Sequence, residues 1–177
     1  MASLATGNHI IQGEYRVTAD PDVALTTLLG SCVAACIWDP LLHVGGMNHF
    51  LLPGDNEQQI RDSERFGVHL MELLVNALFR HGASRQRLVA KLFGGANMNS
   101  QLADIGSRNA EFAQRFLRNE DIKIVGESLG GDRARKLQFW PATGRARQML
   151  LPKDVAPSEP RKTLVPDLAG SGAVELF

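Results

Sequence analysis

Two apolar segments around one short turn are the feature that most constrains how this chain folds. The segments are "CVAACIW" (32–38) and "VGGMNHFLL" (44–52), and each has the length and apolar character of a strand. The turn that follows the first segment, "DPLL" (39–42), has Asp first and Pro second, which is typical of a type I turn. The sequence therefore predicts an antiparallel β-hairpin.

The register of this hairpin decides which side chains meet. If a two-residue loop closes Asp39 on Leu42, Cys32 lies directly opposite His49. If a four-residue loop closes Asp39 on Val44, His49 is the diagonal neighbour of Cys32 on the same face. A three-residue loop puts the two side chains on opposite faces. Two of the three simple registers therefore bring an imidazole beside a thiol.

A thiol beside an imidazole is a candidate nucleophile. An ordinary thiol is only a few per cent thiolate at neutral pH, and an imidazole that takes its proton favours the reactive form. Gly30 permits close approach of the backbone, and main-chain N–H groups around Ser31 and Cys32 could hold a developing oxyanion. The alternative is that the cysteine only fills the core, as most cysteines in apolar strands do. We assign that role to Cys36.

Composition and cysteine spacing exclude several classes of protein. Lys plus Arg equals Asp plus Glu at 19 each, which argues against a nucleic-acid binder. The chain lacks an apolar run of roughly 20 residues and a secretory signal, so a cytoplasmic location is expected. In a strand, Cys32 and Cys36 lie about 13 Å apart, whereas a disulfide tolerates only about 7 Å. Both are predicted to be thiols, and their spacing lacks the partners of a zinc site.

The 177 residues, 44% of them apolar, fit one domain. We expect a flexible N-terminus over 1–9, a single catalytic domain over 10–152 and a disordered Pro-rich tail over 153–177. Helices are predicted from a Ser63 cap to about residue 82 and over about 105–119. The other apolar segments read as strands. The predicted fold class is α/β of the α+β type, a layered sandwich of largely antiparallel hairpins with two main helices.

Four segments resemble the CheD family and occur in the expected order. They are "LGSCVAACIWDP…GGMNHFLLP", "KLFGGANM" (91–98), "IGSRN" (105–109) and "GGDRARKLQF" (130–139). The resemblance covers roughly residues 10 to 151. It implies a fold similar to the catalytic domains of deamidating bacterial toxins, and it makes Cys32 the expected nucleophile.

The resemblance also implies an activity. CheD proteins are protein-glutamine deamidases, amidohydrolases that convert selected glutamines of methyl-accepting chemotaxis receptors to glutamate and release ammonia. By position, Cys32 is the nucleophile, His49 the base and Thr26 the residue that orients His49, with Thr27 a neighbouring competitor. The reaction passes through a thioester and needs no metal or cofactor.

Further residues are candidates for binding the substrate or its oxyanion. They are Gly30 and Ser31 at the turn, together with Arg108 and Asn109 of "IGSRN", which is predicted to start the second helix. Capping and packing of that helix is an equal alternative for Arg108 and Asn109. The glycine turn "GGANM" is expected to help wall the site.

Two other functions stay open. The chain could be an interaction module, because some CheD members bind and modulate a CheC-type phosphatase. It could instead be another Cys-His amidase or esterase acting on small molecules, which would need an apolar pocket. In each case the expected protein is not inserted in a membrane, although its receptor partners are membrane proteins.

Overall fold

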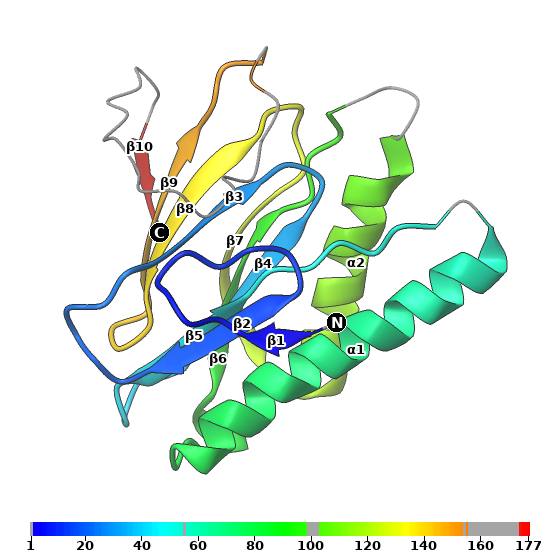
Figure 1. Ribbon diagram of the computed structural model, residues 1–177. Coiled ribbons are helices and arrows are strands. Elements are labelled where there is room, and N and C mark those ends of the chain that lie inside the picture. Colours follow the sequence, from blue (N-terminus) through cyan, green and yellow to red (C-terminus); the bar gives the residue numbers. More distant parts are fainter. Residues whose placement is uncertain (1, 55, 99–102, 154, 156–173) are drawn as a thin grey trace.

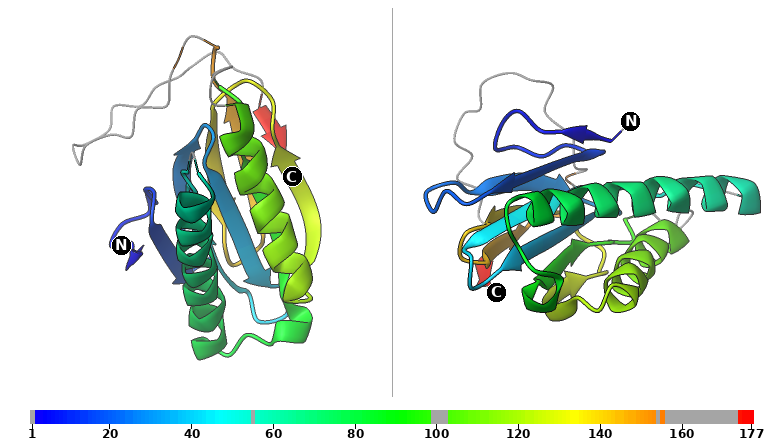
Figure 2. Two further views of the ribbon diagram at one scale, coloured as in Figure 1. Left: turned by 90° about the vertical axis from the view of Figure 1, so that its right-hand side faces the viewer. Right: turned by 90° about the horizontal axis from the view of Figure 1, so that it is seen from below.

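The computed structural model describes residues 2–54, 56–98, 103–153, 155 and 174–177. This part of the chain forms three layers (Figures 1 and 2). Helices α1 (Glu57–Arg80) and α2 (Ala103–Asn119) cover one face of a six-stranded sheet, and a four-stranded sheet covers the other face. The arrangement is the α+β sandwich predicted from the sequence.

The larger sheet has the strand order β1-β2-β5-β4-β6-β7. Its strands are β1 (Ser3–Leu4), β2 (Glu14–Thr18), β5 (Val44–Asn48), β4 (Val33–Asp39), β6 (Val89–Gly94) and β7 (Lys123–Leu129). The smaller sheet has the order β10-β9-β8-β3, built from β10 (Val174–Leu176), β9 (Arg145–Leu150), β8 (Arg135–Trp140) and β3 (Leu25–Leu29). A short 3-10 helix, Arg85–Arg87, precedes β6.

Strand β4 lies at the centre of the molecule. It pairs antiparallel with both β5 and β6, and all seven of its residues are buried. Ile37 packs in the apolar layer under the helices, whereas Cys36 packs in the layer between the two sheets. A strand covered on both faces has no polar face, which explains the unbroken apolar run from Val33 to Trp38.

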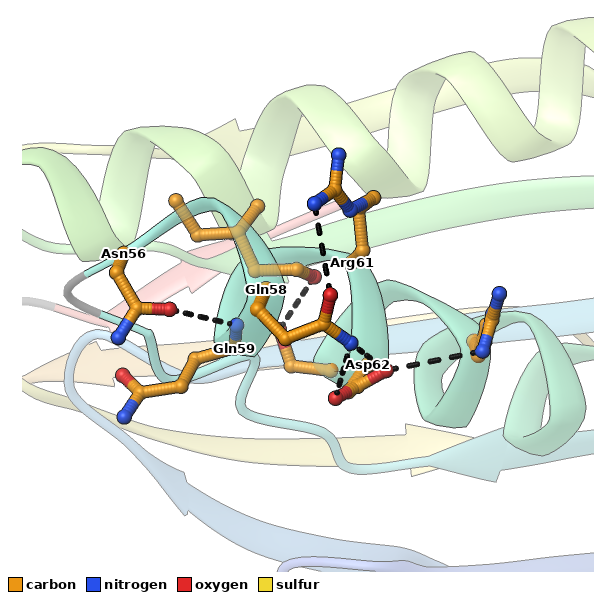
Figure 3. Close-up of polar contacts among 8 residues, drawn as sticks. Asn56, Gln58, Gln59, Arg61 and Asp62 are labelled. Carbon is orange, nitrogen blue, oxygen red and sulfur yellow. Dashed lines mark hydrogen bonds and ion pairs between the residues drawn. The ribbon is translucent and has the colours of Figure 1, made fainter.

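Helix α1 begins earlier than the sequence predicted. Its N-cap is Asn56, whose side chain accepts a hydrogen bond from the Gln59 N–H at 3.0 Å (Figure 3). Glu57 occupies the first turn. An Asn cap followed by an acidic residue is a helix start. Ser63, the predicted cap, lies inside the helix and donates its hydroxyl to the Ile60 carbonyl.

Both ends of the chain depart from the expected disorder. Residues Ser3–Leu4 pair in parallel with β2, and the Asn8 carbonyl accepts from Thr26 N–H at 2.8 Å. At the other end, β10 pairs with β9, and the Phe177 ring lies 5.5 Å from the Phe93 ring. The rest of the predicted tail, apart from residues 153 and 155, lies outside the described residues. None of the described helices is both long and apolar enough to cross a bilayer.

Candidate active site

The register of the β4–β5 hairpin is the one with the four-residue loop. Asp39 pairs with Val44, Cys36 pairs with Met47, and the ladder reappears as a bridge between Val33 and Phe50. The loop closes with a bond of 3.0 Å from His43 N–H to the Asp39 carbonyl, with His43 in the left-handed region at φ 56°.

This register puts Ala34 directly opposite His49 and makes Cys32 the diagonal neighbour of His49 on the same face of the sheet. That face looks into the layer between the sheets, where Ala34 and Cys36 pack. Diagonal Cβ atoms are about 7 to 8 Å apart, which long side chains can bridge. The predicted juxtaposition of Cys32 with His49 on one face is therefore present in the hairpin.

Cys32 lies in the turn between β3 and β4, where neighbouring loops hold the backbone. The Gly95 N–H donates to the Cys32 carbonyl at 2.8 Å, and the Ala96 N–H donates to the Gly30 carbonyl at 2.9 Å. The Cys32 side chain is partly exposed, whereas Cys36 is fully buried and burial raises the pKa of its thiol. Of the two thiols, Cys32 is the one that a substrate can reach.

The His49 ring is held at Nδ1 by two oxygen atoms. Its Nδ1 lies 2.9 Å from the Thr27 hydroxyl and 3.3 Å from the Ile10 carbonyl, and the residue is 1% exposed. The Thr27 hydroxyl donates to the same carbonyl at 2.7 Å. Because a carbonyl only accepts, and because the Thr27 proton is already donated, Nδ1 carries the ring proton. In neutral His49 the nitrogen without a proton is therefore Nε2.

The contact with His49 that was predicted for Thr26 is made by Thr27 instead. Side chains alternate along β3, so Thr27 shares the buried face with Leu25 and Leu29, and Thr26 points to the other face. There its hydroxyl lies 3.2 Å from Nδ1 of His9. The alternation of Leu25 and Leu29 about the Thr doublet is visible in the sequence and could have identified Thr27. The role of the Ile10 carbonyl has no such sequence signal.

Helix α2 brings the two "IGSRN" residues to the same region, where both bind main-chain groups. Asn109 is fully buried, donates through Nδ2 to the Ser31 carbonyl at 2.7 Å and accepts through Oδ1 from the Leu52 N–H at 3.0 Å. Arg108 is partly buried and donates through Nη2 to the Gly54 carbonyl at 2.9 Å. Both side chains bind the main chain that flanks Cys32 and His49.

Glycines allow the loops around Cys32 to pack without side chains. A Cβ atom at Gly94, which has φ 114°, would lie 2.1 Å from the Cys32 carbonyl oxygen. A Cβ atom at Gly106 of α2 would lie 2.5 Å from the carbonyl oxygens of both Gly95 and Ala96. The glycine turn after β6 therefore separates the cysteine loop from α2 by the width of a bare backbone.

Other possible sites lie elsewhere or are not formed. Among the described residues, no group of three or more His, Cys, Asp or Glu is arranged to hold a metal ion. A shallow hollow lined by Pro21, Asp22, Trp140, Thr143 and Arg145 lies at the opposite end of β3 and β8 from Cys32.

Comparisons with known proteins identify the family of this chain. The family model for CheD chemotactic sensory transduction matches residues 51–149. A protein of Acidiphilium cryptum named "Probable chemoreceptor glutamine deamidase CheD" is 56% identical over 175 residues, which are 96% of this chain and 92% of that one. Proteins of the same name from Agrobacterium fabrum and Caulobacter vibrioides are 55% and 53% identical, over 84% and 96% of this chain and 82% and 92% of their own. The chain therefore belongs to the CheD family.

Among solved structures, the Bacillus licheniformis hypothetical protein YfiH is similar, with a TM-score of 0.42 and 12% identity over 64% of this chain and 49% of that one. A likeness of this size carries no argument about function.

Proposed function

We propose that this protein is a cytoplasmic chemoreceptor glutamine deamidase, with Cys32 as nucleophile and His49 as general base and acid. The observation that carries the proposal is the shared face of the hairpin: an accessible thiol and a buried imidazole side by side, with the imidazole held through Nδ1. The names of relatives that match over almost the whole chain supply the substrate class.

The hydrogen bonds of His49 set the first step. With its proton on Nδ1, the ring has its lone pair on Nε2, and this lone pair takes the proton of the Cys32 thiol. The imidazolium that forms has an Nδ1–H directed at two oxygens, the Thr27 hydroxyl and the Ile10 carbonyl, which stabilise its positive charge. Thiolate and imidazolium together are the reactive form.

The remaining steps follow from these groups. The Cys32 sulfur attacks the side-chain amide carbon of a glutamine, and the C–N bond breaks as ammonia leaves with the proton that His49 returns. A water molecule, deprotonated by His49, then cleaves the thioester. The carbon–sulfur bond breaks and the sulfur recovers its proton from His49. The products are the glutamate carboxylate, the Cys32 thiol, ammonia and one proton, which ammonia binds as ammonium, so atoms and charge balance without a cofactor.

The test is a mass measurement on a receptor fragment. The parent protein is expected to raise the intact mass of a helical chemoreceptor fragment by about one mass unit per modified glutamine and to release an equal amount of ammonia. The same fragment with alanine at the glutamines that gained mass is the matched control. Ammonia release from free glutamine at the same rate as from the fragment would instead favour a small-molecule amidase.

Two neighbouring threonines give a sharp test of how His49 is held. Thr27→Ala removes one oxygen from Nδ1, and a hydrogen bond worth about 1 kcal/mol corresponds to about a fivefold fall in kcat. Thr27→Ser, which keeps the hydroxyl, is expected to restore most of the rate. Thr26→Ala is the matched variant on the other face of β3 and is expected to lose less activity than Thr27→Ala. The reverse order of the two alanine variants would return the orienting role to Thr26.

Binding of a CheC-type phosphatase stays a prediction. A pull-down with purified CheC-type protein and the Cys32→Ala variant, which should be unable to turn over, separates such binding from catalysis.

A further inference from the structure

The side chain of Asn109 occupies a position that a backbone peptide would normally take. In the register of the hairpin, Val33 and Phe50 exchange two hydrogen bonds of 2.9 Å, so the next hydrogen-bonded pair of the ladder is Ser31 with Leu52. The Leu52 N–H donates instead to Oδ1 of Asn109, and the Ser31 carbonyl accepts from its Nδ2. A side-chain amide from α2 is thus inserted into the ladder.

The orientation of this amide is settled by its partners. The Ser31 carbonyl only accepts and the Leu52 N–H only donates, so Nδ2 and Oδ1 cannot be exchanged. The Asn109 amide holds the Ser31 segment and the Leu52 segment apart by the width of one amide group, immediately beside Cys32. Helix α2 is itself packed closely against the glycine turn at Gly106.

The insertion acts on both reactive residues. Ser31 directly precedes Cys32, and Leu52 follows His49 by three residues on the other side of the hairpin. In a planar trans peptide the carbonyl and the N–H point in opposite directions. The bond from Asn109 to the Ser31 carbonyl therefore also fixes the direction of the Cys32 N–H, which belongs to the same peptide.

We propose that Asn109 is a positioning residue for deamidation: its amide, inserted between Ser31 and Leu52, sets the separation and orientation of the Cys32 loop and the His49 strand. The inference rests on the proposed function for its reaction, but its physical content is the reactivity of Cys32. Without the Asn109 amide, the Ser31 and Leu52 segments can move closer together or further apart. A misplacement of about 1 Å costs about a hundredfold in rate.

Two variants distinguish the effects of the two hydrogen bonds that Asn109 makes. Asn109→Asp keeps an acceptor for the Leu52 N–H, loses the donor to the Ser31 carbonyl and adds a buried negative charge beside the thiolate. Asn109→Ala loses both bonds. The matched control is Asn48→Ala, because Asn48 is also fully buried and accepts from a β4 N–H, that of Ala35, at 3.1 Å, but its side chain contacts Met71 of α1 on the opposite face.

The first readout is the reaction itself. Asn109→Ala is expected to lower kcat about a hundredfold with KM changed less than about threefold. Asn48→Ala is expected to lose a similar amount of thermal stability and to keep kcat within about threefold of the parent value. Equal losses of kcat in Asn109→Ala and Asn48→Ala, or a change confined to KM, would overturn the positioning role.

The second readout needs no substrate, and it separates failure of this inference from failure of the proposed function. Alkylation of Cys32 by iodoacetamide, followed by peptide mass, is expected to slow about tenfold at pH 7 in Asn109→Asp and to approach the parent rate at higher pH, because the added charge disfavours the thiolate. An unchanged alkylation profile in both Asn109 variants overturns the inference. If the alkylation profile changes in the Asn109 variants while the parent protein deamidates no receptor fragment, the positioning role is sustained and the proposed function is refuted. Asn109→Asp keeps one of the two bonds and serves if Asn109→Ala does not fold.

Discussion

Replacement of Cys32 by alanine is expected to abolish deamidation while leaving the fold unchanged. Without the sulfur no thioester forms, and loss of a nucleophile from a catalytic pair typically lowers kcat by more than about ten-thousandfold. The side chain is partly exposed, so its truncation opens no large cavity. The measurement is the intact mass of the receptor fragment, together with a thermal melt of the variant.

Cys36→Ala is the matched control for this prediction. Cys36 lies four residues further along the same hairpin strand and on the same face, but it is fully buried and burial raises the pKa of its thiol, which disfavours the thiolate. Its replacement is expected to cost about 1 kcal/mol of stability and to leave the rate within about twofold. Deamidation by Cys32→Ala, or equal loss of activity in both folded variants, would contradict the assignment. Retained receptor binding by inactive Cys32→Ala would show that binding and catalysis are separable.

Asp39→Ala is expected to cost the most stability among single polar changes in the hairpin, about 3 kcal/mol. The Asp39 carboxylate is fully buried at the end of β4 and pairs with Arg87 at 2.8 Å. It also accepts from the N–H groups of Leu41, Leu42 and Ser84 at 3.0 to 3.1 Å. Truncation leaves these donors without their acceptor and loosens the turn that sets the hairpin register.

The pH dependence of this contribution has a definite sign. Burial acts to raise the pKa of Asp39, but the hydrogen bonds from Arg87 and from the Ser84, Leu42 and Leu41 N–H groups outweigh it and lower the pKa from 3.8 to about 2. Because the folded-state pKa is lower than the unfolded one, the stabilisation is complete above about pH 4 and is lost as the pH falls towards 2. The depression corresponds to about 2 kcal/mol.

Urea denaturation at pH 7 and pH 3 measures both effects. The control is Glu64→Ala, because Glu64 forms an ion pair of the same length scale, 2.7 Å to Arg115, between side chains that are 40% and 52% exposed. Exposed pairs contribute under about 1 kcal/mol. Equal destabilisation by Asp39→Ala and Glu64→Ala at pH 7, or an Asp39→Ala variant that loses as much stability at pH 3 as the parent does, would refute this account.

Local sequence patterns predicted the parts of the site that depend on period and on chain neighbours. Strand alternation carries side-chain direction over a few residues, so a hairpin centred on Asp39 was enough to restrict Cys32 and His49 to one face in two of three registers. The choice among registers was not local. It depends on Asp39, whose second oxygen binds the Ser84 N–H from beyond α1, and on His43 in the left-handed region.

The misassigned residues have specific causes. A position counted from Cys32 favours Thr26, whereas the alternation of Leu25 and Leu29 favours Thr27. The polar run before Ser63 resembles a loop, although Asn56 and Glu57 carry the signals of a helix N-terminus. The ends of the chain were expected to be disordered, yet β1 and β10 each complete a sheet edge.

The sequence by itself determined that a thiol and an imidazole occupy neighbouring strands. The reason is that side-chain direction in a strand repeats every two residues and that the four-residue segment 39–42 has the composition of a turn. Only the tertiary structure decided how the pair is held. Thr27 and the Ile10 carbonyl reach His49 from the second sheet and from the segment before β2, and Asn109 reaches Ser31 and Leu52 from a helix almost eighty residues beyond the cysteine turn. Contacts between layers depend on how whole elements pack, and no pattern within one segment records which residue of another layer will face it.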